Sequence, residues 1–215
     1  MPPRFFAALL ALALGASPLP AQRGPRLALS VPAPRSATVE GPLVGGDGLL
    51  ADRQLRDLLR NGFPARLHYR VELWSVGGFA NDLERKTEWD VVVRYDPLDR
   101  SYRVARLLGD QVLLLGSFAD LAGAETAVEL PFRAPIAATR RGQRYYYNVV
   151  LDVEILSLSD LDEVERWLRG ELTPAVRGRR NPGTALTRGL RTLFVRLLGG
   201  ERRHFELRSA TFRAE

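Results

Sequence analysis

The sequence predicts an α+β fold: a mainly antiparallel, twisted sheet or sandwich of about 6–8 strands with about three helices. Three observations predict it. Apolar and polar residues alternate over long stretches, turn-forming residues separate successive stretches, and the helical patterns do not alternate regularly with the strands. The alternation also predicts that one face of the sheet is solvated, as is common for antiparallel sheets.

The two longest predicted strands are Ala65–Trp74 and Tyr145–Ile155, in which every second residue is apolar. Glu88–Tyr95 repeats this pattern. Asp96–Asp99 then supplies turn residues that lead into a strand at Tyr102, which indicates an antiparallel hairpin. Shorter patterns predict strands at Leu27–Val31, Ala37–Val44, Gln111–Leu115 and residues 205–210, a loop at Gly45–Gly48, and a short helix or turn at Ser117–Val128.

Three segments have helical periodicity. The first begins after Asp52 and stops at Asn61–Pro64, where Asn-Gly and Pro end a helix in the expected way. The second begins after Ser159, a good N-cap, and ends at Gly170. The third covers about residues 184–198 and ends at a pair of glycines.

Residues 1–21 have the form of a secretory signal peptide. Arg4 precedes the apolar run Phe5–Leu14, and small residues allow cleavage after Ala16 or Ala21. The run is too short to span a bilayer, which takes about 20 residues, so we expect no transmembrane span in the mature chain. We therefore expect an exported protein, periplasmic or secreted, with one α+β domain over residues 22–215. In it, residues 22–36 form a flexible lead-in, and residues 174–215 form a basic loop, a helix and a final strand.

The composition is that of a folded protein with an uneven charge. The 215 residues contain no cysteine, which excludes a disulfide scaffold and a thiolate metal site. The formal net charge is +6, and 30 of the 31 basic residues are arginine. Residues 174–215 carry ten arginines against three acidic residues. A basic patch of this kind suits nucleic acid, but the export signal argues against nucleic acid as the partner.

Motifs for catalysis and for cofactors are missing from the sequence. The two histidines, His68 and His204, do not have the spacing of a zinc site, and neither a nucleophile elbow nor a phosphate-binding loop is present. We expect both histidines to be exposed on the surface; they would meet only if their two strands were neighbours. The acidic cluster of residues 160–165 is explained by a helix N-terminus. We therefore predict no catalytic residue, no cofactor and no metal.

Two features are candidates for interaction. Six arginines form a basic loop and helix that would suit a carboxylate, a phosphate or anionic lipid headgroups, or that simply reflect an arginine-rich chain. They are Arg177, Arg179, Arg180, Arg188, Arg191 and Arg196. In the run Tyr145–Tyr147, the outer two tyrosines belong to the predicted core face. Tyr146 lies on the other face, where it either packs or makes an exposed contact.

The order of these segments resembles a bacterial exported family, domain of unknown function 4390. The resemblance covers roughly residues 27–172 and rests on the leader, Asn61–Pro64, the strand Leu67–Trp74, the hairpin Tyr95–Val104 and the acidic helix that ends at Trp167–Leu172. The family carries no established activity, cofactor or catalytic residue. The resemblance implies an exported envelope protein in a context linked to a membrane sensor kinase.

Three hypotheses follow for the function. The first is a non-enzymatic binding or accessory module of the cell envelope, linked to a membrane sensor system and bound to an envelope protein. The second is a peripheral membrane protein that uses its basic amphipathic helix on an anionic lipid surface. The third is a hydrolase with an unrecognised site around His68 or His204.

Overall fold

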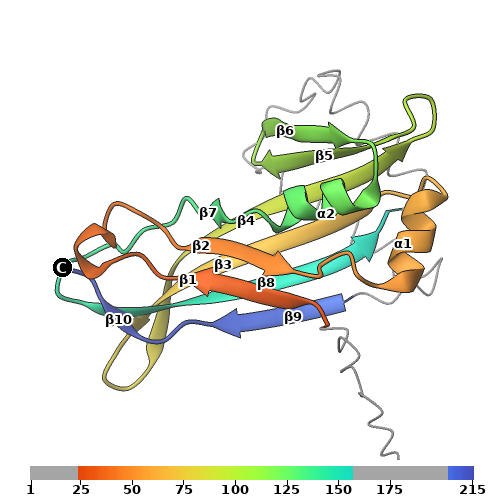
Figure 1. Cartoon of the computed structure of the whole chain (residues 1–215). Helices are drawn as coiled ribbons and strands as arrows, with labels where there is room; N and C mark the ends of the chain where they lie inside the picture. Colours follow the sequence, from red (N-terminus) through yellow and green to blue (C-terminus); the bar gives the residue numbers. More distant parts are fainter. Residues whose placement is uncertain (1–23, 157–202) are drawn as a thin grey trace, which may run out of the picture.

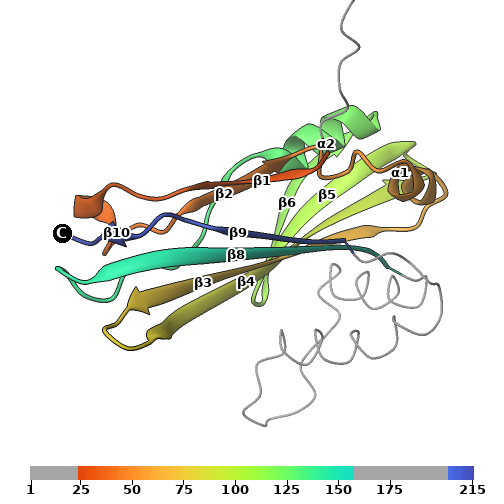
Figure 2. The same cartoon turned by 90° about the horizontal axis from the view of Figure 1, so that it is seen from below.

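The computed structural model describes residues 24–156 and 203–215, and in this part of the chain the fold is α+β with two antiparallel sheets. The predicted fold class is confirmed. Figures 1 and 2 show the smaller sheet lying over one face of the larger one, with α1 and α2 on that same side or at its end.

The large sheet has seven strands in the order β10-β8-β3-β4-β5-β6, with β9 also paired to β8. Its strands are β3 (Ala65–Val76), β4 (Asn81–Asp96), β5 (Ser101–Leu108), β6 (Gln111–Phe118), β8 (Arg144–Ile155), β9 (Arg203–Arg208) and β10 (Phe212–Arg213). All of its strand pairs are antiparallel. Among the described residues, β6 therefore ends the sheet on one side, while β9 and β10 follow each other along β8 on the other.

The small sheet and the helices cover the inner face of the large sheet. The sheet has the order β1-β2-β7. Its strands are β1 (Arg26–Ser30), β2 (Leu43–Asp47) and β7 (Phe132–Arg133), and the helices are η1 (Pro34–Ser36), α1 (Arg53–Arg60) and α2 (Leu121–Glu129). The predicted helix after Asp52 is confirmed, because the Asp52 carboxylate accepts a hydrogen bond from the Leu55 N–H and Gly62 follows the helix with φ +88°.

The core lies between the two sheets and follows the predicted alternation. Leu67, Tyr69, Val71 and Leu73 of β3 are at most 2% exposed. The Tyr69 ring stacks on Trp89 of β4 with centroids 5.0 Å apart, and Trp89 meets Phe132 of the small sheet edge-on. These aromatic contacts join the two layers.

Residues 37–48 differ from the prediction. The strand expected at Ala37–Val44 begins only at Leu43, and the expected loop Gly45–Gly48 is strand as far as Asp47. The glycines serve close packing rather than a turn. A Cβ on Gly46 would lie 2.8 Å from the carbonyl oxygen of Arg26 on the paired strand and 2.7 Å from the Leu49 side chain.

Other elements were placed correctly but with different ends. β4 begins at Asn81, β6 continues to Phe118, and α2 begins at Leu121. The predicted leader, the helices after Ser159 and at residues 184–198, and the loop between them lie outside the described residues. In the part that the structure describes, no helix is long and apolar enough to cross a membrane.

The expectation that the outer face of the large sheet is solvated is wrong at its centre. Arg66 of β3 and Val92 of β4 are each 6% exposed, and Leu107 of β5 is 7% exposed, although all three lie on the face opposite the core. This face carries the polar residues described next.

Candidate functional site

A row of histidines and aspartates crosses the outer face of the large sheet. His204 of β9 is paired with Asp152 of β8, Asp152 with His68 of β3, and His68 with Asp90 of β4. Direct partners on antiparallel strands have their Cβ atoms about 4.5–5.5 Å apart on the same face. Four strands therefore bring two imidazoles and two carboxylates into one line.

Each histidine of this line hydrogen-bonds to an aspartate. His68 Nδ1 lies 2.8 Å from Asp90 Oδ1, and His204 Nδ1 lies 2.9 Å from Asp152 Oδ1. The side chain of His68 is 16% exposed and that of His204 is 55% exposed. The carboxylate fixes the orientation of each ring.

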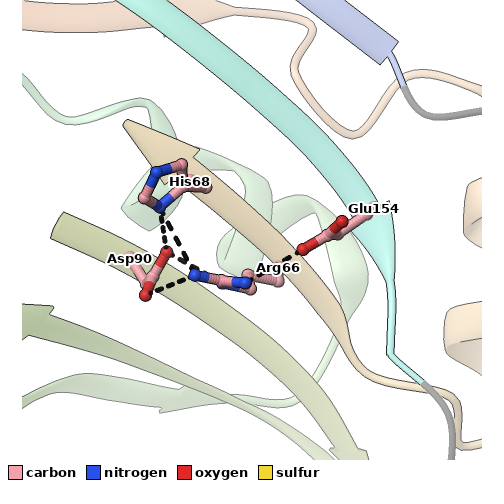
Figure 3. Close-up of polar contacts among 4 residues, drawn as sticks. All are labelled: Arg66, His68, Asp90 and Glu154. Atoms are coloured by element: carbon pink, nitrogen blue, oxygen red, sulfur yellow. Dashed lines mark hydrogen bonds and ion pairs between the residues drawn. The ribbon is translucent and has the colours of Figure 1, made fainter. Parts of the chain in front are cut away.

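Arg66 connects this line to a third carboxylate. Its Nε and Nη2 donate to the two oxygens of Asp90 at 2.8 and 3.0 Å, and its Nη1 donates to Glu154 at 3.0 Å. Figure 3 shows the guanidinium between Asp90 and Glu154, with His68 against Asp90. We call these six residues, His204, Asp152, His68, Asp90, Arg66 and Glu154, the polar row.

The electrostatics keep the central pair charged. Burial would raise the pKa of Asp90, but the hydrogen bond from His68 and the charge of Arg66 outweigh it and lower that pKa. Burial would likewise lower the pKa of Arg66, but its attraction to Asp90 and Glu154 raises it. Since all three guanidinium nitrogens already have carboxylate partners, Arg66 is a closed ion-pair centre rather than an open anion site.

A histidine held by a carboxylate is also the general-base half of a catalytic triad. Within the described residues, the hydrogen bonds of the two histidines go to Asp90, Arg66 and Asp152, and none goes to a serine. The hydroxyls of Ser75 and Ser209 donate to backbone carbonyls instead. The described ranges also contain no group of three or more acidic or histidine side chains placed to hold a metal ion.

The structure corrects one expectation about the histidines and agrees with another. The prediction that both are exposed on the surface is wrong for His68, whose ring is largely buried against Asp90. As expected, their strands are not neighbours: β8 lies between β3 and β9 and places Asp152 between the two rings. The polar residues at alternate positions of β3 and β8 were visible in the sequence. Their mutual pairing depends on strand order, which local patterns do not give.

The predicted interaction residues have different outcomes. Arg177, Arg179, Arg180, Arg188, Arg191 and Arg196 lie outside the described residues. Tyr146 does lie on the face opposite the core, but it is only 7% exposed. The Arg208 guanidinium lies 3.5 Å from the centre of its ring, and Trp74 lies parallel to it at 6.2 Å. Tyr146 is therefore a packed residue, and the alternative of an exposed contact is wrong.

An exposed apolar segment that was not predicted as a site lies at the edge of the large sheet. Val112, Leu113 and Leu114 of β6 are 39%, 57% and 63% exposed. Among the described residues, β6 is paired only with β5, as Figure 1 shows at that end of the sheet. We call Val112–Leu114 the apolar edge. The sequence signal was the run of four apolar residues from Val112 to Leu115, which breaks the alternation of the other strands.

The opposite edge of the sheet has a different character. β9 carries Arg203, Glu206 and Arg208, whereas residues 111–119, which include all of β6, carry no charge. Charged side chains on an edge strand prevent pairing with other chains, and an uncharged apolar edge invites it. In the described part of the chain, the apolar edge is thus the site best suited to an interaction.

Comparison with known proteins gives no relative: no family model, no curated protein and no solved structure matches this chain. The polar row and the apolar edge are therefore interpreted from their geometry, and the resemblance to domain of unknown function 4390 stays a prediction.

Proposed function

We propose that this protein is an exported, non-enzymatic binding module of the cell envelope that recognises another polypeptide by adding a strand to its large sheet at β6. The observation that carries the proposal is the exposure of the apolar edge, Val112–Leu114, on a strand that has only one partner among the described residues. Strand addition would give this exposed edge a function.

Strand addition uses both the backbone and the side chains of an edge. The N–H and C=O groups of β6 that have no partner strand among the described residues supply main-chain hydrogen bonds to an extended peptide, and the alternating side chains supply selectivity. Leu113 lies on the face of the core, while Val112 and Leu114 lie on the outer face beside Leu107 and Ala105. A partner strand with apolar residues on both of its faces fits this edge.

The polar row supports a binding role rather than catalysis. Its central groups are engaged with one another, since Arg66 holds Asp90 and Glu154 while His68 also binds Asp90. Such a closed network stabilises the sheet and leaves no oriented nucleophile in the described residues. The leader-like residues 1–21 support export, and the resemblance stated above supports an envelope partner such as a membrane sensor.

Photo-crosslinking in living cells tests this proposal. A photoreactive phenylalanine analogue replaces Leu113 in a tagged, exported full chain; the control places it at Leu98, which is 91% exposed in the β4–β5 turn. We expect a defined polypeptide adduct at position 113 that is absent at position 98. The adduct should also disappear when Leu114 is changed to Lys, because a charge on the edge opposes strand pairing.

Two results would contradict the proposal. The first is equal crosslinking at positions 98 and 113, which would indicate random collisions. The second is no adduct at position 113 in cells where the protein is folded and exported. Mass spectrometry of the adduct identifies the polypeptide, and circular dichroism of each purified variant checks that the fold is retained.

A further inference from the structure

We infer that the strand that pairs with β6 is β6 of a second copy of this chain, so that the apolar edge forms a symmetric dimer. This inference rests on the proposed function, because it names the partner at the same edge. Three features of β6 support it: its lack of charge, the apolar residues on both of its faces, and the continuity of the edge with an apolar cluster on the outer face.

The lack of charge on β6 favours pairing with a second copy. A two-fold symmetric strand pair places each side chain near its own copy, so any charge close to the symmetry axis meets the same charge. Residues 111–119 contain no charged residue, and so they carry no such repulsion. In contrast, the β9 edge would bring Arg203 and Arg208 toward residues of the same sign or toward Glu206, depending on register. In the described part of the chain, β6 is the edge best suited to pairing with itself.

The symmetry of such a pair limits its register. An antiparallel pair of edge strands within one continuous sheet is related by a two-fold axis perpendicular to the sheet, and this axis preserves the faces. Opposed residues must then lie on the same face. The axis therefore runs between one residue and its own copy on the other strand, and not between two successive residues of one strand. The pairing of β5 with β6 shifts register between Leu114 and Gly116, which leaves residues 111–114 as the regular part of the edge.

An axis at Leu113 suits this regular part best. It pairs Val112 of each copy with Leu114 of the other and places Leu113 beside Leu113. Shifting the axis to Val112 would bring the Asp110 carboxylate opposite Leu114, an unfavourable match of a charge with an apolar side chain. The side-chain chemistry therefore selects Leu113 as the central residue.

The apolar surface of the outer face continues to the edge of the sheet. Val92, Ala105 and Leu107 form a small buried cluster on the outer face of β4 and β5. Val112 and Leu114 pair directly with Leu107 and Ala105, so they extend this cluster to the sheet edge, where they are exposed. Pairing two copies brings the two clusters together and removes Val112 and Leu114 from water, which is the driving force expected of an apolar contact.

Charged substitutions at Leu113, next to the axis, test the dimer, and mixing two variants of opposite charge tests whether it can be restored. Sedimentation velocity of the purified wild-type chain, across about 1–200 μM to cover weak and moderate affinities, should show a concentration-dependent rise to twice the monomer mass. Leu113→Lys and Leu113→Glu should each weaken association at least about tenfold, since each places two like charges side by side. An equimolar mixture of the two variants should restore the dimer, because Lys then meets Glu. Leu98→Lys is the matched control and should associate like the wild type.

A cysteine at the same position tests the register. The natural chain has no cysteine, so Leu113→Cys introduces a single thiol. Residues opposed across an antiparallel pair have Cβ atoms about 4.5–5.5 Å apart, and a disulfide needs about 3.5–4.5 Å, so a small local shift of the two strands closes the bond. With an added oxidant, Leu113→Cys should give a covalent dimer in high yield, whereas Leu98→Cys, at a more exposed position, should give only the collision background.

The outcomes separate this inference from the proposed function. A monomer at all concentrations, or a dimer that Leu113→Lys leaves unchanged, overturns the inference. The inference also fails if an equimolar mixture of Leu113→Lys and Leu113→Glu does not restore the dimer. If position 113 still crosslinks in cells to a different polypeptide, the proposed binding module stands with another partner. If it crosslinks to nothing, both fail.

Discussion

Arg66 and Asp90 form a two-pronged ion pair on the outer face of the large sheet, with Nε to Oδ1 at 2.8 Å and Nη2 to Oδ2 at 3.0 Å. The pair joins β3 to β4, and Glu154 extends it to β8. Because the Arg66 side chain is only 8% exposed, neither charge regains full hydration when its partner is removed. Removing one partner of the pair should therefore cost more stability than the intact pair contributes.

We expect Arg66→Leu to lower the free energy of unfolding by about 3–5 kcal/mol, because it leaves the Asp90 and Glu154 carboxylates on the sheet without their shared cation. The matched control is Arg103→Leu, which removes an arginine 51% exposed beside Asp96 and Asp99. Its effect should be within about 1 kcal/mol, as is typical of surface pairs. Urea unfolding at neutral pH measures both, and equal losses for the two variants would contradict the importance of burial.

The stability of the protein should decrease in acid through Asp90. Its pKa lies below the usual value because the hydrogen bond from His68 and the charge of Arg66 outweigh the effect of burial. The unfolded chain therefore binds a proton more readily than the folded one. The stability that Asp90 provides is present above the unfolded pKa of about 3.9 and is lost as the pH falls through the lower folded value.

The measurement is the free energy of unfolding between about pH 2 and pH 6 for the wild type and for Asp90→Asn. Asn keeps the size of the side chain but does not titrate, so the variant should be less stable near pH 6 and should lose less stability on acidification. Parallel curves for the two proteins would show that Asp90 is not the group responsible. Asp99→Asn, at an exposed carboxylate of the β4–β5 turn, serves as the control for a change of net charge.

Gly46 tests the close packing of the small sheet. A Cβ there would lie 2.8 Å from the Arg26 carbonyl oxygen and against both methyl groups of Leu49, so the strand or the core must move. We expect Gly46→Ala to cost about 1–3 kcal/mol. Gly78→Ala, where a Cβ meets nothing within 4 Å, should be close to neutral. Thermal unfolding of both variants compares them, and a neutral Gly46→Ala would show that β1 and β2 are not so tightly packed.

Local patterns in the sequence identified the elements with strong periodicity. The inward residues Leu67, Tyr69 and Val71 of β3, the β4–β5 hairpin and the capped helix α1 were all predicted, because alternation, turn residues and caps are local signals. Gly45 and Gly46 were misplaced for a related reason. A glycine run has the same local appearance in a turn and in a strand that another backbone approaches closely, and only the fold distinguishes them.

The candidate sites depended on contacts that local patterns do not contain. His68 and His204 belong to strands that β8 separates, and their alignment with Asp90 and Asp152 follows from the order of the strands. The apolar edge had a local signal in Val112–Leu115, but whether such a run is buried depends on whether another strand lies beside it. The arginines singled out from the sequence lie outside the described residues, so their role stays a prediction.

The histidines provide a direct test of a binding role against a catalytic one. If the apolar edge works as a separate binding surface, changing both His68 and His204 to Gln should leave the yield of the Leu113 photo-adduct within about twofold of the wild type. The expected cost is in stability instead, because each imidazole hydrogen-bonds to an aspartate: about 1.5–3 kcal/mol for the largely buried His68, and less than about 1 kcal/mol for the exposed His204. Urea unfolding measures that cost, and single variants separate the largely buried His68 from the exposed His204. A variant that stays folded but forms no adduct would show that binding depends on the polar row, and the role assigned to β6 alone would then be wrong.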